Sequence, residues 1–143
     1  MGLLVLYKVM LPTKLSYNKE EKLKSRKLIN HLFDHGKHIQ AFPLKMLYDF
    51  VEESPQHLQA GVTISSRNFK KAVDRNRAKR VIRECYRLKK NSLQFILKEK
   101  GLALNLFFIY THKEMPDYVL VKEKMQLLLQ KLEEMIKNLT PQK

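Results

Sequence analysis

Residues 67 to 90 constrain the fold most, because their charge is both crowded and ordered. The segment holds eleven of the 28 basic residues but only two of the 14 acidic ones, so its net charge is +9 out of +14. On a helical wheel its apolar residues fall within one arc and its arginines fall opposite. A helix of this kind buries one side in a protein core. The crowded positive charges on its other side repel one another, so we expect a polyanion to bind there and neutralise them.

The two sides of this expected helix differ in chemistry. The apolar arc consists of Ala78, Val81, Ile82, Cys85 and Leu88, and the basic side of Asn76, Arg80, Arg83 and Arg87, flanked by Arg77, Lys79 and Lys90. Arginine binds phosphate with two parallel hydrogen bonds, whereas lysine acts as a point charge. A solvated charged helix usually alternates the sign of its charges. Here Asp74 and Glu84 are the only acidic neighbours, so the pattern indicates nucleic-acid binding.

The composition is that of one globular domain in a reducing compartment. A chain of 143 residues with 44% apolar content can build a single core. The one cysteine, Cys85, cannot form an internal disulfide, which favours the cytoplasm. Cys85 also lies on the apolar arc, so we expect it to pack in the core.

The N-terminus carries the longest apolar run, residues 1 to 12. It is too short to span a bilayer, and its only basic residue comes late rather than first, unlike a signal peptide. We expect a flexible N-terminal extension over residues 1–16, one RNA-binding domain over 17–139 and a short tail over 140–143.

Periodicity predicts an α+β sandwich in the order α-β-β-β-α-β-α. A helix begins after Ser25 and ends at Gly36. Residues 38 to 51 form one bent strand or two short ones, interrupted at Pro43, with Leu44, Met46, Tyr48 and Phe50 on one side. Strands follow at 60–65 and, buried in the middle of a sheet, at 102–111.

A final helix follows Pro116 and Asp117. Its apolar stripe consists of Val121, Met125, Leu128, Leu129, Leu132, Met135 and Ile136. The stripe is short for a coiled-coil dimer, so packing on the chain's own sheet is favoured.

Nothing in the sequence predicts a catalytic or metal site in this chain. Metal-dependent cleavage of phosphodiesters needs clustered carboxylates, and those of this chain are scattered. His31 and His35 have the i,i+4 spacing of zinc ligands but lack the glutamate of the H-E-x-x-H motif. We interpret them as helix-surface histidines, and we expect the protein to bind no cofactor.

The basic helix resembles a known signature. Residues 75 to 84 match R-N-R-x-K-R-x-x-R of the bacterial ribonuclease P protein component. Leu23, Leu32, Phe33 and Gly36 resemble the first helix of that family, and residues 61 to 65 resemble the strand before the basic helix. The resemblance covers about residues 17 to 137. One departure is at 65 to 67, where Ser-Ser-Arg replaces a usual Lys-Lys pair.

The resemblance implies a function and completes the fold. The protein would be the accessory subunit of ribonuclease P, an endoribonuclease that removes the 5′ leader of precursor tRNA. The active site and its Mg²⁺ ions would belong to the RNA subunit, and the protein would be a monomer in a 1:1 cytoplasmic ribonucleoprotein. The fold would contain a mixed four-stranded sheet with a left-handed βαβ crossover.

Two sets of site residues follow from the resemblance and from the chemistry of the side chains. The RNA-binding set is Arg67, Lys70, Lys71, Arg75, Asn76, Arg77, Lys79, Arg80, Arg83 and Arg87. A cleft between the first helix and the sheet would hold the single-stranded leader, because bases stack on exposed aromatic rings. Its candidate residues are Ile29, Phe33, Phe42 and Tyr48.

Two other functions fit the charge of the chain. A structural RNA-binding protein, such as a ribosome-associated factor, would have the same basic face but no leader cleft. A protein that binds anionic membranes needs a large apolar helix face beside its cations. The sheet-rich middle of the chain argues against the membrane alternative.

Overall fold

Four strands form one mixed sheet in the computed structural model, which describes residues 19–139. The strands are β1 (Lys37–Ala41), β2 (Leu44–Val51), β3 (Leu58–Ile64) and β4 (Ala103–Tyr110), in the sheet order β1-β2-β4-β3. β2 is antiparallel to β1 and β4, whereas β3 and β4 are parallel. Residues 38 to 51 therefore form two strands rather than one bent strand. The extension 1–16 and the tail 140–143 lie outside the described residues.

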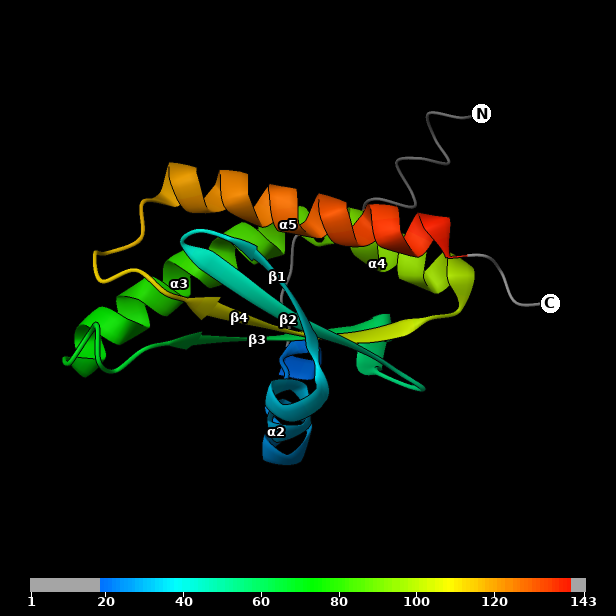
Figure 1. Ribbon diagram of the computed structural model, residues 1–143, viewed down its shortest axis with the longest axis horizontal. Helices are drawn as coiled ribbons and strands as arrows, with labels where there is room; N and C mark the ends of the chain where they lie inside the picture. Colours follow the sequence, from blue (N-terminus) through cyan, green and yellow to red (C-terminus); the bar gives the residue numbers. More distant parts are fainter. Residues whose placement is uncertain (1–18, 140–143) are drawn as a thin grey trace.

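Helices cover both faces of the sheet (Figure 1). α2 (Arg26–His35) lies on one face, against β2 and β4. The other face carries α3 (Ala72–Lys89), α4 (Asn91–Lys100) and α5 (Tyr118–Asn138), with α5 packed along both α3 and α4. Two 3-10 turns, η1 (Lys19–Glu21) and η2 (Pro55–His57), complete the described elements. The predicted α+β sandwich is confirmed.

One helix, α4, is absent from the order expected from the sequence. The observed order is α-β-β-β-α-α-β-α, because α4 follows α3 after the single residue Lys90. The backbone of Lys90 is itself helical, with φ −76° and ψ −20°, so neither proline nor glycine marks the boundary. α4 ends at Gly101, whose φ of +68° lies in the left-handed region that glycine adopts without strain.

The core has two parts, one on each side of the sheet. A large cluster lies between the sheet and α3, α4 and α5, and a small one under α2 contains Leu23, Leu32, Leu47 and Phe107. The α5 stripe packs on the chain's own sheet as predicted, except that Met135 is 40% exposed. No helix within residues 19–139 has both the length and the apolar content needed to cross a bilayer.

The apolar arc of α3 faces this core. Ala78, Ile82 and Cys85 are fully buried, and Val81 and Leu88 are half-buried. Burial raises the pKa of the Cys85 thiol to about 11, so the thiol is protonated at neutral pH. The predicted core position of Cys85 is confirmed.

Adjacent leucines of α5 test this packing. Leu128 is fully buried, whereas Leu127 is 39% exposed. Leu128→Ala should lower the free energy of unfolding by about 2–5 kcal/mol, because it removes buried methyl groups and leaves a cavity. Leu127→Ala, the matched control, should change it by no more than about 1 kcal/mol. Urea unfolding measures both values, and equal losses would contradict the assigned face of α5.

Candidate nucleic-acid interface

The loop before α3 is held by Arg75, the first residue of the signature. Its Nη1 atom donates to the carbonyl oxygens of Phe69 and Lys70, both at 2.8 Å. Arg75 is half-buried, whereas Lys70 and Lys71 are exposed. Arg75 therefore supports the loop that presents these two lysines, in addition to any contact that it makes with a ligand.

The same loop is anchored to the end of β4. The side-chain amide of Asn68 donates to the carbonyl oxygens of Thr111 and His112, each at 3.4 Å. The backbone N–H of Arg67 donates to Ser65 Oγ at 3.2 Å, and the side chain of Arg67 is exposed. The loop and the first turn of α3 thus form one supported basic surface.

The basic side of α3 faces solvent as the helical phase predicts. An open hollow of about 470 Å³ is lined by Asn76, Arg80, Arg83, Glu84 and Arg87. Arg77 is exposed beside it, and Lys79 is half-buried. Within residues 19–139, no carboxylate pairs with Arg77, Arg80 or Arg83. These three guanidinium groups are therefore free to bind an anion.

Glu84, the carboxylate in the hollow, is paired with Arg87. Arg87 Nε donates to Glu84 Oε1 at 3.2 Å, and Arg87 Nη2 donates to Oε2. These hydrogen bonds lower the pKa of Glu84 and raise that of Arg87. Because Arg87 compensates Glu84, the positive charge of Arg80 and Arg83 is left in excess.

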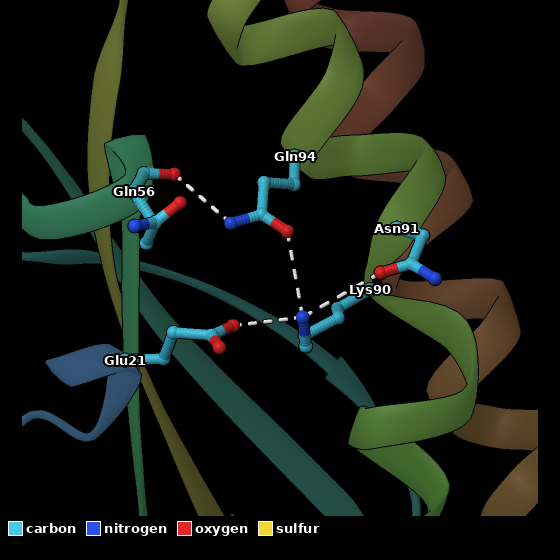
Figure 2. A network of polar contacts seen from close by, with 5 residues as sticks. All are labelled: Glu21, Gln56, Lys90, Asn91 and Gln94. Carbon is cyan, nitrogen blue, oxygen red and sulfur yellow. Dashed lines mark hydrogen bonds and ion pairs between the residues drawn. The ribbon is translucent and has the colours of Figure 1, made fainter. Parts of the chain in front are cut away.

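Lys90 does not flank this surface, contrary to the sequence prediction. Its side chain is 1% exposed, and its Nζ atom lies 2.7 Å from Glu21 Oε1 (Figure 2). Helical phase alone assigned it to the basic side. The packing of η1 and α4 around the end of α3 encloses it instead.

A second hollow, of about 180 Å³, lies where α2 and the residues that lead into it meet strands β3 and β4. We call it the groove, and it is lined by Lys22, Leu23, Lys24, Ile29, Ala60, Gly61, Val62, Thr63, Arg83 and Phe107. Phe33 of α2 is 52% exposed and meets the Phe107 ring edge to face, with the ring centroids 5.5 Å apart. The groove therefore combines apolar and aromatic walls with basic residues.

Gly61 makes room for one wall of the groove. A Cβ atom at this position would lie 2.7 Å from two ring carbons of Phe107, which is closer than packed atoms tolerate. Arg83 lines both the groove and the hollow on α3. The two candidate surfaces therefore meet at this arginine.

The structure separates the four candidate cleft residues. Ile29 lines the groove and Phe33 lies beside it, in contact with Phe107. Phe42 is 57% exposed at the turn between β1 and β2, against His112, and does not line the groove.

Tyr48 lies on the opposite face of the sheet, so it is not a residue of the groove. It is 5% exposed, its hydroxyl is 3.8 Å from Met135 Sδ of α5, and burial raises its pKa. Side chains alternate along a strand, so Tyr48 shares the side of Met46, which faces the large core. Leu47 points to the α2 side instead.

Sequence reasoning missed Leu47, Phe107 and the basic residues Lys22 and Lys24. The signal for Phe107 was available, because both sides of β4 carry large apolar residues and only one side could face the final helix. Lys22 and Lys24 gave no such signal, since they precede α2 in a segment without periodicity.

The histidines of α2 lie on the helix surface as interpreted. His31 and His35 are exposed, with ring centroids 4.9 Å apart, and His31 Nδ1 is 3.1 Å from Asp49 Oδ2. In the part of the chain that the structure describes, no three His, Cys, Asp or Glu side chains are grouped so that they could hold a metal ion.

Comparison with known proteins places the chain among related sequences. The sequence model of the family Ribonuclease P matches residues 17–134. The ribonuclease P protein component of Porphyromonas gingivalis is 34% identical over 116 residues, which cover 80% of this chain and 85% of the relative. That of Chlorobium phaeobacteroides is 32% identical over 127 residues, covering 80% and 86%.

Solved structures share the fold. The RNase P protein from Thermotoga maritima has a TM-score of 0.61 and 24% identity, over 78% of this chain and 96% of that one. The RNase P protein of Staphylococcus aureus has a TM-score of 0.55 and 20% identity, over 85% and 100%. At these identities the structures support the fold alone. The family model and the sequence relatives establish that the chain belongs to the family of ribonuclease P protein components.

Proposed function

We propose that this protein binds the catalytic RNA subunit of ribonuclease P and the 5′ leader of precursor tRNA, and so promotes removal of the leader. The active site and its Mg²⁺ ions belong to the RNA subunit in this proposal, and the protein supplies no catalytic residue. It acts in the cytoplasm as one copy in a 1:1 ribonucleoprotein. The observation that carries the proposal is that Arg77, Arg80 and Arg83 of α3 have no carboxylate partner within residues 19–139, in a member of this family.

The α3 surface suits the RNA subunit. Arg77, Arg80 and Arg83 have no carboxylate partner among residues 19–139, so phosphates can neutralise them without breaking an existing ion pair. Each guanidinium group can donate two parallel hydrogen bonds to one phosphate. This geometry favours a folded RNA, whose phosphates have fixed positions. The loop lysines held by Arg75 extend the same surface.

The groove suits a single-stranded leader. Exposed Phe33 and its partner Phe107 offer aromatic faces and edges, and bases stack on such rings with little dependence on sequence. Lys22, Lys24 and Arg83 lie around the same hollow and can neutralise the leader's phosphates. Because Arg83 also belongs to the α3 surface, a leader in the groove would lie next to the bound RNA subunit.

Reconstitution tests the function directly. The purified protein alone should not cleave precursor tRNA, because this proposal assigns it no catalytic residue. Mixed with a cognate ribonuclease P RNA at low Mg²⁺, it should restore cleavage at the mature 5′ end, measured by gel analysis of labelled precursor. Cleavage by rigorously RNA-free protein would refute the proposal.

Arg80→Ala tests the α3 surface. Each phosphate neutralised by the protein releases counterions, so affinity falls with salt concentration. Loss of one phosphate contact should weaken binding of the RNA subunit and reduce the slope of log affinity against log salt by about 1. Lys131→Ala serves as the control, because it also removes one positive charge, from an exposed position on α5 rather than on α3. An unchanged slope for Arg80→Ala would show that this face does not bind RNA.

Phe33→Ala tests the groove. Losing one stacked base should lower the affinity for leader-bearing precursor by about 5- to 150-fold and leave that for leaderless tRNA unchanged. Phe95→Ala removes a similarly exposed phenylalanine (45% against 52%) from α4 on the other side of the sheet, and should change neither affinity. Fluorescence titration of the reconstituted ribonucleoprotein measures both. Equal effects on the two substrates would place the leader elsewhere.

A further inference from the structure

Lys90 lies at the centre of a buried polar network. Its ammonium group has three N–H donors and three oxygen neighbours: Glu21 Oε1 at 2.7 Å, Gln94 Oε1 at 3.4 Å and Asn91 Oδ1 at 3.5 Å (Figure 2). Lys90 is 1% exposed and Glu21 is 5% exposed. Lys90 is thus a buried, paired residue and does not add its charge to the basic surface.

Glu21 belongs to the segment that leads into α2, and this segment forms one wall of the groove. The next residues are attached to strand β3. The backbone N–H of Leu23 donates to the carbonyl of Ala60 at 2.8 Å, and Lys22 forms a parallel bridge with Ala60. Lys22, Leu23 and Ala60 all line the groove, so Glu21 is directly adjacent in the chain to one of its walls.

The network also holds the turn between β2 and β3. Gln94, which accepts from Lys90, donates through Nε2 to the carbonyl of Gln56 at 3.1 Å. Gln56 and His57 have φ of +56° and +64°, a strained region for residues other than glycine. This turn immediately precedes β3, the strand to which the lead-in of α2 is attached.

The Glu21–Lys90 ion pair is buried, so the position of Glu21 depends on the charge of Lys90. Each charge is removed from water and is stable there only while its partner is present. Removing the Lys90 charge takes the ammonium group away from the buried Glu21 carboxylate, which weakens the attachment of the lead-in of α2 to the end of α3. The pair therefore holds the groove wall against the junction of α3 and α4.

We propose that Glu21 and Lys90 are positioning residues for leader binding, which connect the wall of the groove to the end of the RNA-binding helix. Neither touches RNA. The pair keeps the lead-in of α2 on β3. It thereby fixes the position of the groove relative to the arginine surface of α3. This inference rests on the proposed function, because it assigns the pair a role in binding the leader.

Four variants test it. Lys90→Met removes the charge and keeps the length of the side chain, and Glu21→Gln keeps the volume. The exchange pair E21K/K90E restores opposite charges but loses the contact with Gln94 Oε1, because the Gln94 amide donates to the Gln56 carbonyl and cannot turn without breaking that bond. Lys89→Met, the control, removes the same charge from the adjacent residue of α3, which makes no ion pair within residues 19–139.

Three measurements are made on folded protein, checked by circular dichroism. Amide hydrogen exchange at Leu23 should be faster in Lys90→Met and Glu21→Gln than in wild type or Lys89→Met. The ratio of affinities for leader-bearing and leaderless precursor should fall at least about fivefold, the factor for one lost base contact. The salt slope for the RNA subunit should stay at the wild-type value in Lys90→Met. The exchange pair should recover part of the lost affinity ratio.

Two results would overturn the inference. A folded Lys90→Met variant with wild-type exchange at Leu23 and a wild-type affinity ratio would show that the pair only fills the core. A salt slope reduced by about 1 would show that Lys90 contacts RNA. If Lys90→Met does not fold, Glu21→Gln decides by the same criteria.

Failure of the proposed function looks different. Wild-type ribonucleoprotein would then bind leader-bearing and leaderless precursor equally. Exchange at Leu23, measured on the free protein, would still show whether the pair holds the lead-in of α2.

Discussion

Burial of β4 on both faces is the constraint on which the rest of the structure depends. Leu104, Leu106 and Phe108 face the large core, and Phe107 and Ile109 face the α2 side. A strand without a solvent face has to lie inside the sheet, between β2 and β3, with a helical layer above and below. That position creates the α2 side of the molecule, and with it the groove beside Phe107.

The orientation of α3 follows from the same core. Ala78, Ile82 and Cys85 can be buried only if α3 packs with this stripe inward, and the opposite side then has to face solvent. The arginines are therefore exposed because of apolar packing behind them. Arg83, at the margin of this side, reaches the groove as well, so one helix serves two candidate RNA surfaces.

Periodic elements could be predicted from the sequence, and elements without a distinct signal could not. The stripes of α3 and α5 and the alternation of β2 and β3 follow from local periodicity, and β4 follows from its apolar run. Whether residues 38 to 51 form one strand or two was left open by the sequence. α4 escaped prediction because Lys90 continues the helical backbone without a breaking residue. Tyr48 was assigned to the cleft by its chemistry, although its alternation with Leu47 already placed it on the side of Met46.

By itself, the sequence determined which helix carries the arginines, which side of it they occupy and which family signature they form. These properties depend only on residue order and helical phase. Only the tertiary structure decided which cations face solvent. Lys90 has the phase of the basic surface but meets Glu21, a residue far away in the chain, and Arg75 is held by carbonyl groups of the preceding loop. The physical reason is that burial and pairing of a charge depend on neighbours brought together by folding, which no local pattern specifies.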